Sequence, residues 1–285
     1  MGKLKQLSDS RPIFIGLILL LLSLLLRIND IFVLKIDELW GEIIISKALG
    51  FLLILLYLFL IKRSAKSIGL HSENIGKNLF IGFAAISLVY LIGYISEYII
   101  LLLSKSGPDI VISAIDPKQG VNGGVIFAFW LIFGNIINSF MEEGLFRGLL
   151  IPKLMTKFSF WHSNLLQSFL FGLWHLVWPV KDILMGKQNI TEGLIAGAVI
   201  FIGTVINGVI LGYMYYKTNS LWTPWIAHTL TNSILNLIHI NSNISMDAMM
   251  TVRVTAALIL GLLSLFVIKI FADRFKMNQI TTWDI

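Results

Sequence analysis

Residues 123–151 read GGVIFAFWLIFGNIINSFMEEGLFRGLLI, an apolar stretch long enough to cross a lipid bilayer that nevertheless contains Glu142, Glu143 and Arg147. An acidic side chain at the centre of a membrane helix costs roughly 2.5–3.5 kcal/mol on insertion scales. Ionisable residues at such depth normally face a protected cavity and pair with another group. The stretch therefore predicts a membrane-spanning helix that carries a functional site.

The rest of the chain has the composition of a polytopic membrane protein. Hydrophobic residues make up 56% of its 285 residues and charged residues 13%, and the mean hydropathy is +0.83. These values lie far outside the range of ordinary soluble domains. The absence of cysteine excludes disulfides, thiolate metal sites and cysteine nucleophiles. We interpret the net charge of +6 through membrane topology and not as a nucleic-acid-binding surface.

Eight segments are apolar and long enough to cross the hydrocarbon core of a bilayer. They cover residues 12–28, 40–61, 78–103, 123–151, 161–180, 192–216, 221–241 and 247–271. No internal repeat or low-complexity linker separates them. We predict an all-α, polytopic membrane helical bundle of about eight transmembrane helices. It forms a single integral-membrane domain over residues 1–285, with a motif-bearing catalytic core at about 123–241.

The distribution of Lys and Arg predicts that both termini lie in the cytoplasm. With the N-terminus inside, the inner side carries thirteen Lys and Arg residues, and the outer side carries six, Arg27 among them. An excess of positive charge marks the cytoplasmic side, and an even number of spans agrees. Lys47 lies within the second span and is expected to snorkel toward its end. The predicted location is the cell membrane, with multiple crossings.

The two glutamates of the opening stretch are not equivalent. Residues four apart lie on one face of a helix, so Glu143 is expected to pair with Arg147. Glu142 has no such cation on its own helix and is expected to experience desolvation and the like charge of Glu143, which suits it to proton transfer. The alternative is that both glutamates belong to a structural ion pair that holds helices together.

Two other spans contribute histidines. His175 ends the segment FGLWH in the fifth span, and His228 is followed one helical turn later by Asn232 in the seventh. For either histidine alone, a hydrogen bond between helices is the simpler explanation. Together with Glu142 they are sufficient for hydrolysis of a peptide bond by water. Glu142 would take a proton from water that His175 helps to hold, while His228 and Asn232 would donate hydrogen bonds to the oxyanion.

These three segments resemble the motifs of the CPBP family, which comprises CAAX proteases and bacteriocin-processing enzymes and is also called the type II CAAX prenyl endopeptidase or Abi family. The family pattern is EExxxR, FxxxH and HxxxN on separate core helices. The matching residues are Glu142-Glu143-x-x-x-Arg147, Phe171-x-x-x-His175 and His228-x-x-x-Asn232. They occur in the family's order, and all lie within apolar segments.

The resemblance implies an eight-helix intramembrane endopeptidase. Its catalytic Glu142 and His175 would activate water, and His228 and Asn232 would stabilise the transition state. Glu143 and Arg147 would support the site. The implied partners are membrane lipid and a membrane-associated or lipidated protein or peptide, such as a prenylated C-terminal tail or a leader peptide. The resemblance implies no nucleic-acid partner.

Whether such a site holds a metal is open at this point, because the family has been described both as metalloproteases and as glutamate proteases. Zinc would take Glu142, His175 and His228 as its three protein ligands. The metal-free mechanism is favoured, because Arg147 neutralises Glu143 and an asparagine such as Asn232 is a poor zinc ligand.

Two functions outside the peptidase class also stay open. Glutamate and histidine chains form proton relays in transporters, although the chain shows no inverted repeat of the kind transporters use. A catalytically silent immunity or scaffolding protein is the other alternative.

Three further polar residues receive no role in the predicted site. Glu97 and Arg253 lie within the third and eighth spans without a local partner, and His239 is interpreted as an ordinary residue at a helix boundary.

Overall fold

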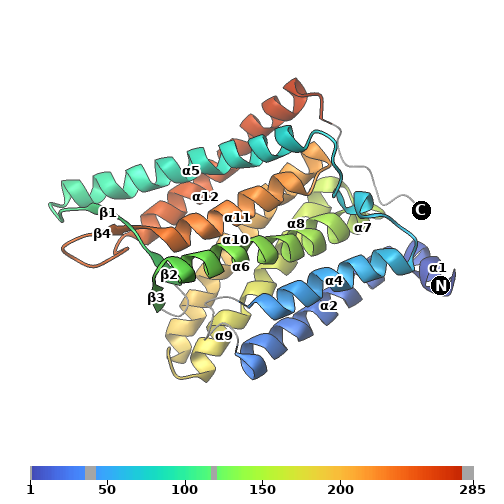
Figure 1. The fold of residues 1–285 in the computed structure, drawn as a ribbon, viewed down its shortest axis with the longest axis horizontal. Helices are drawn as coiled ribbons and strands as arrows, with labels where there is room; N and C mark the ends of the chain where they lie inside the picture. The colour runs from blue at the N-terminus through green and yellow to red at the C-terminus, as the bar shows by residue number, and fades with distance from the viewer. Residues whose placement is uncertain (1, 36–42, 117–120, 278–285) are drawn as a thin grey trace.

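The computed structural model describes residues 2–35, 43–116 and 121–277, which form a helical bundle (Figure 1). At its centre, α6 (Val125–Glu143) packs between α4 (Ile44–Leu60) and α11 (Trp222–Leu237). The other α-helices are α1 (Gly2–Ser10), α2 (Pro12–Asn29), α5 (Ile75–Leu103), α7 (Ile151–Met155), α8 (Phe160–His175), α9 (Val177–Leu184), α10 (Ile190–Thr218) and α12 (Met250–Arg274), and shorter helical turns are η1 (Asp30–Leu34) and η2 (Ala65–Ile68). The predicted all-α class is confirmed. Residues 40–42 of the predicted second span lie outside the described residues.

Five segments are long and apolar enough to cross a membrane, judged by length and composition. They are Pro12–Leu34, Ile75–Leu103, Val125–Met155, Ile190–Thr218 and Met250–Arg274. Together they support a multi-pass membrane protein. The helices α4, α8 and α11 are shorter, with 17, 16 and 16 residues. The count of about eight crossings therefore stays a prediction.

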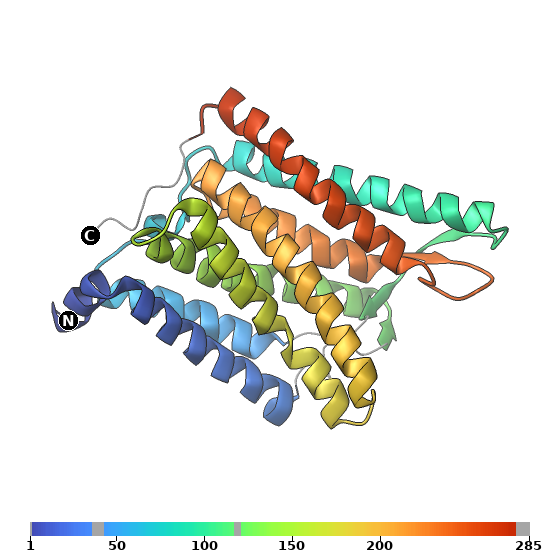
Figure 2. The ribbon, with the colours of Figure 1, turned by 180° about the vertical axis from the view of Figure 1, so that it is seen from behind.

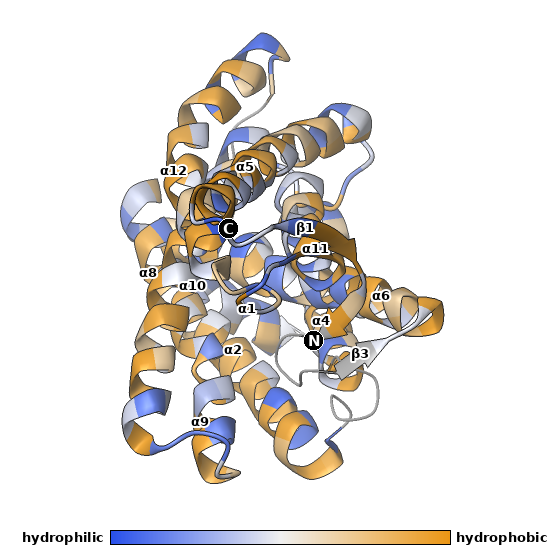
Figure 3. Ribbon diagram, turned by 90° about the vertical axis from the view of Figure 1, so that its left-hand side faces the viewer, coloured by the Kyte–Doolittle hydropathy of each residue, from blue (hydrophilic) through white to orange (hydrophobic). Residues whose placement is uncertain are grey.

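Apolar side chains point outward from the bundle, and charged side chains are buried within it. Leu103 is 77% exposed and Phe59 is 66% exposed, whereas Glu143 and Arg147 are fully buried. Figure 3 shows that hydrophobic residues predominate along most of the helices. Large exposed apolar surface of this kind marks a membrane contact, and buried intramembrane charges face the bundle interior.

The chain leaves α6 through a π-helix, η3 (Gly144–Leu150), and not through a regular α-helix. Pro152 follows this π-helix in the first turn of α7, where the N–H group that proline lacks would have no hydrogen-bond partner within the helix. All seven residues of η3 are buried, Arg147 among them. π-Helical turns are rare and occur frequently at functional sites.

Two short antiparallel strand pairs lie at the end of the bundle opposite α1 (Figure 1). In the first, β1 (Asp109–Ile112) pairs with β4 (Ile238–Asn241); in the second, β2 (Ala114–Asp116) pairs with β3 (Val121–Gly123). The predicted span 221–241 is wrong at its end, because the helix stops at Leu237 and the chain continues as β4. Likewise the predicted span 161–180 is divided, since α8 ends at His175 and α9 begins at Val177.

Four ionisable residues, which we call the strand-end clamp, link α5, β4 and α12: Glu97, His239, Asp247 and Arg253. Arg253 Nε lies 3.3 Å from Glu97 Oε2, and Arg253 Nη2 donates to Asp247 Oδ1 at 2.9 Å. Asp247 Oδ2 lies 2.6 Å from His239 Nδ1. His239 is only 1% exposed, so its interpretation as an ordinary boundary residue is wrong.

The ion pair between His239 and Asp247, beyond the ends of α11 and α12, predicts a pH-dependent stability. Burial lowers the pKa of His239, but its contacts with Asp247 outweigh burial and raise the pKa above its ordinary value. Burial raises the pKa of Asp247, but the hydrogen bond from His239 and the charge of Arg253 bring it below its ordinary value. The contribution of His239 to the free energy of unfolding is therefore complete below about pH 6.5 and is lost as pH rises through its raised pKa. The contribution of Asp247 to the free energy of unfolding is lost as pH falls through its lowered pKa.

We expect the melting temperature of the detergent-solubilised protein to fall as pH rises from about 6 to about 9. The variant His239→Gln should show a flatter profile over the same interval, because it has no imidazole to titrate. Parallel profiles for the two proteins would contradict the prediction.

Candidate active site

Glu142 lies near the end of α6 and is hydrogen bonded to three other helices. Its Oε1 accepts from Arg27 Nη1 of α2 at 3.0 Å, from Lys47 Nζ of α4, and from Trp174 Nε1 of α8 at 2.9 Å. The Glu142 side chain is 1% exposed. Its carboxylate is therefore a junction of four helices, and two cations compensate its burial.

The second oxygen of Glu142 faces two imidazole rings. Glu142 Oε2 lies 3.8 Å from His228 Nε2 and 4.0 Å from His175 Nε2. Within the described part of the chain, Oε2 accepts no hydrogen bond. A water molecule bridges polar groups separated by more than about 3.5 Å in many active sites. The structure thus brings three of the predicted site residues together around one free carboxylate oxygen.

The backbone of α8 fixes the orientation of the His175 ring. His175 Nδ1 lies 2.8 Å from the carbonyl oxygen of Phe171, one helical turn earlier. A carbonyl oxygen only accepts, so Nδ1 carries the hydrogen and Nε2 of the neutral ring presents a lone pair. The same nitrogen faces Glu142 Oε2. The His175 side chain is 19% exposed, whereas that of His228 is 4% exposed.

Glu143 connects Arg147 to His228. Arg147 Nη1 donates to Glu143 Oε1 at 3.0 Å, which confirms the ion pair predicted from their spacing. His228 Nδ1 lies 2.7 Å from the same oxygen and donates to it. Arg147 also lies over the ring of Phe171, with Cζ 4.3 Å from the centroid. Glu143 therefore orients His228 so that its Nε2 faces Glu142.

Asn232 is not joined to this group by a polar contact. It lies one turn after His228 on α11, is half-buried, and makes no hydrogen bond with a described residue. Polar contacts between α6 and this part of α11 include those of Asn135, whose Nδ2 donates to Asn236 Oδ1 at 3.0 Å and to Ser233 Oγ at 3.3 Å. The role predicted for Asn232 therefore stays a prediction.

The two cations that contact Glu142 were not predicted from the sequence. Arg27 was counted with the charges outside the membrane but is 2% exposed, and Lys47 was expected to snorkel but is 1% exposed. The snorkelling expected for Lys47 is wrong, because its side chain turns inward to a buried carboxylate, as that of Arg27 also does. The side of the membrane on which Arg27 lies stays a prediction. A signal was present in the sequence: Glu142 had no cation on its own helix, and two other apolar spans carried one basic residue each near an end.

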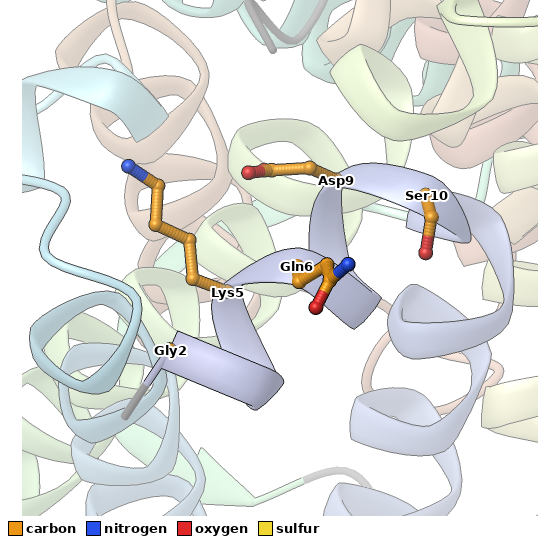
Figure 4. Close-up of a pocket in the computed structure, with 5 residues that line it drawn as sticks. All are labelled: Gly2, Lys5, Gln6, Asp9 and Ser10. Atoms are coloured by element: carbon orange, nitrogen blue, oxygen red, sulfur yellow. The ribbon is translucent and has the colours of Figure 1, made fainter.

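The hollow in Figure 4 is a separate feature of α1. It is lined by Gly2, Lys5, Gln6, Asp9 and Ser10. None of the predicted site residues contributes to it. The candidate active site is therefore defined by the buried group around Glu142 and not by this surface hollow.

Two observations on the described residues favour the metal-free site over the zinc alternative, and the choice between them stays a prediction. Among residues 2–35, 43–116 and 121–277, no group of three His, Asp or Glu side chains has the arrangement of a metal site. In addition, Arg27 and Lys47 contact the carboxylate that would have to ligate zinc. Two positive charges at that position repel a divalent cation.

The family model described as "Type II CAAX prenyl endopeptidase Rce1-like" matches residues 124–234. The matched segment lies inside the predicted core at about 123–241 and contains Glu142, His175, His228 and Asn232. The match confirms the family resemblance and supports an intramembrane peptidase of the CAAX type. No curated protein matches the chain at a significant level.

Proposed function

We propose that the chain hydrolyses a peptide bond with water activated by Glu142 and His175, because residues 124–234 match the family model of Rce1-like type II CAAX prenyl endopeptidases. The observation that carries the proposal is the free Oε2 of Glu142, 4.0 Å from His175 Nε2 and 3.8 Å from His228 Nε2. Both atoms facing the gap between Glu142 and His175 are acceptors. A water there would donate one hydrogen to each and direct its lone pair outward.

In the proposed first step, the oxygen of this water attacks the carbonyl carbon of the scissile peptide bond. Its proton passes to Glu142 Oε2, and the carbonyl oxygen becomes an oxyanion. Collapse of the tetrahedral intermediate breaks the C–N bond, and Glu142 returns the proton to the leaving amine. The carboxylate is thereby regenerated without a covalent intermediate.

The oxyanion would be stabilised by His228 and Asn232. His228 Nδ1 donates to Glu143, so the ring offers a second donor at Nε2 when it carries both hydrogens. The amide of Asn232 would supply another donor from the same helix. Hydrogen-bond donors aimed at a developing oxyanion are typically the largest single contribution in acyl transfer.

The substrate in this proposal is a membrane-associated or lipidated protein or peptide, cleaved near the membrane surface. The proposed reactions are removal of a CAAX-type C-terminal tail and removal of a leader peptide.

We also propose that the chain lies in the cell membrane with about eight crossings and both termini in the cytoplasm. In agreement, α1 and the C-terminal end of α12 lie at the same end of the bundle (Figure 2).

The test is incubation of the purified protein with prenylated and unprenylated peptides, with products identified by mass. We expect cleavage of at least one peptide at an internal bond, and we expect this activity to persist after exhaustive chelation. Absence of cleavage for every peptide would contradict the proposed peptidase. Activity that is lost on chelation and restored by zinc would contradict the metal-free mechanism while supporting the peptidase.

A further inference from the structure

The two cations of Glu142 come from outside the segment that matches the family model. Arg27 belongs to α2 and Lys47 to α4, whereas the match covers residues 124–234. Both side chains contact Oε1 of Glu142, whereas Oε2, the oxygen that faces the imidazoles, accepts no hydrogen bond from a described residue. The carboxylate is thus divided into an anchored oxygen and a free one.

A helix cap brings the two cation-bearing helices to the same place. Asp30 Oδ2 accepts a hydrogen bond from the backbone N–H of Ser46 at 2.7 Å, in the first turn of α4. Arg27 precedes Asp30 by three residues, and Lys47 directly follows Ser46. A carboxylate at a helix N-terminus satisfies a free N–H group and is favoured by the helix dipole. The buried Asp30 therefore sets the end of α2 against the start of α4, where both cations reach Glu142.

A close approach of α4 to α6 completes the arrangement. Gly50 lies one turn after Lys47, and a Cβ atom there would come within 2.9 Å of Met141 Cγ, next to Glu142. Glycine is thus the residue that permits this helix spacing. The position of Lys47 is determined by packing at Gly50 as well as by the Asp30 cap.

The cations also contact the helix that carries His175. Arg27 Cζ lies 4.8 Å and Lys47 Nζ 5.5 Å from the ring centroid of Trp174, which itself donates to Glu142 Oε1. Cations over an indole ring are attracted by its quadrupole. Because His175 is the next residue, the same group of contacts sets both the carboxylate and the imidazole that would hold water.

We propose that Arg27 and Lys47 are positioning residues for the catalytic carboxylate. They hold Glu142 in its ionised form through Oε1 and keep Oε2 turned toward His175 and His228. The inference rests on the proposed function, and it extends the catalytic unit to α2 and α4. The family-matched segment alone then lacks the charges that its buried glutamate requires.

The first test compares substitutions at the two cations in the purified full-length protein. We expect Lys47→Met and Arg27→Gln to lower kcat by roughly 10- to 100-fold, part of the roughly 10²–10⁴-fold contribution of a positioned general base. KM should change little, and the acidic limb of the kcat–pH profile should move to higher pH, because the ionised carboxylate has lost a stabilising cation. Lys47→Arg and Arg27→Lys, which keep the charge, should leave that limb in place.

Lys153→Met is the matched control. Lys153 is also a fully buried lysine, and it donates to the hydroxyl of Tyr57 at 2.7 Å, whereas Glu142 Oε1 accepts from Arg27, Lys47 and Trp174. It should alter neither kcat per folded molecule nor the pH profile. An unchanged kcat and pH profile in both Lys47→Met and Arg27→Gln would overturn the proposal.

The second test needs no cleavage. The infrared difference between the wild type and Glu142→Gln at neutral pH identifies the band of this carboxyl group. We expect a carboxylate band in the wild type and a carboxylic-acid band in the double variant Arg27→Gln/Lys47→Met. A carboxylate band that persists in the double variant would overturn the positioning role. If the double variant does not fold, the single variants Lys47→Met and Arg27→Gln are measured in the same way. In each of them we expect part of the Glu142 carboxylate band to be replaced by a carboxylic-acid band.

The two tests separate failure of this inference from failure of the proposed function. If the wild type cleaves no peptide but the double variant shows the expected infrared change, the proposed peptidase is contradicted and the charge pairing is retained. If the wild type cleaves peptides and the variants without the cations cleave them equally well, the peptidase is retained and the positioning role is contradicted.

Discussion

Glu142→Gln should lower peptide cleavage by roughly 10²–10⁴-fold, the usual contribution of a positioned general base. The amide cannot accept the proton of water, although it occupies the same space and keeps an acceptor oxygen for Arg27, Lys47 or Trp174. The measurement is the rate of product formation in detergent or lipid vesicles, normalised to folded protein.

The substitution also leaves two buried cations opposite a neutral side chain, and removal of one partner from a buried ion pair is strongly destabilising. The charge-balanced variant Glu142→Gln/Lys47→Met therefore serves as the control for folding. It removes one negative and one positive charge from the same contact. We expect it to elute and melt like a folded protein and to remain inactive. Wild-type cleavage by this folded variant would show that Glu142 is only a structural partner.

Arg253→Met should lower the free energy of unfolding by about 3–5 kcal/mol, the range for breaking a buried ion pair from one side. Arg253 is fully buried, and its loss leaves the buried carboxylate of Glu97 without the guanidinium 3.3 Å away. It also removes the donor to Asp247 and the cation over the Tyr94 ring, at 4.3 Å from the centroid. Denaturant unfolding in detergent micelles measures the change.

Two further variants give this prediction its control. In Arg253→Met/Glu97→Gln the unpaired carboxylate becomes neutral, so part of the lost stability should return. Lys269→Met removes an exposed cation from the same helix and should have little effect. A loss of equal size in the single and double variants would show that packing of the arginine side chain, and not its charge, matters at this site.

The strand-end clamp lies at the end of α11, the helix that carries His228 and Asn232. Tyr94 of α5 contributes to the same place, because its hydroxyl donates to the carbonyl oxygen of Ile238. Arg253→Met should therefore reduce activity mainly through the folded fraction. The site itself is anchored separately, through Glu143, Arg147 and the cations of α2 and α4.

Short-range spacing was sufficient for much of the candidate site. The pair of Glu143 and Arg147 is one helical turn apart, and the structure forms it at 3.0 Å. The motifs at 171–175 and 228–232 named two histidines that the structure places within 4.0 Å of Glu142. Such relations follow from helical periodicity and from the cost of burying charge, and both can be evaluated along the sequence.

Contacts between distant segments could not be derived in this way. Arg27 and Lys47 are 115 and 95 residues away from Glu142, and nothing in their local sequence specifies that partner. Each basic residue near the end of an apolar span fits a snorkelling side chain equally well. The strands β1 and β4 escaped prediction for a related reason: four-residue segments gain their stability from pairing across the fold.

The sequence by itself determined that this chain is a multi-pass helical membrane protein with a buried carboxylate and two histidines, since apolar length and the energetic cost of intramembrane charge are local properties. Only the tertiary structure decided which partners each of the two glutamates contacts. Glu143 contacts Arg147 and His228. Oε1 of Glu142 contacts Arg27, Lys47 and Trp174, while its Oε2 accepts no hydrogen bond from a described residue. The physical reason is that a buried charge is stabilised by whichever opposite charge packing brings within contact, and packing joins helices that are distant in the chain.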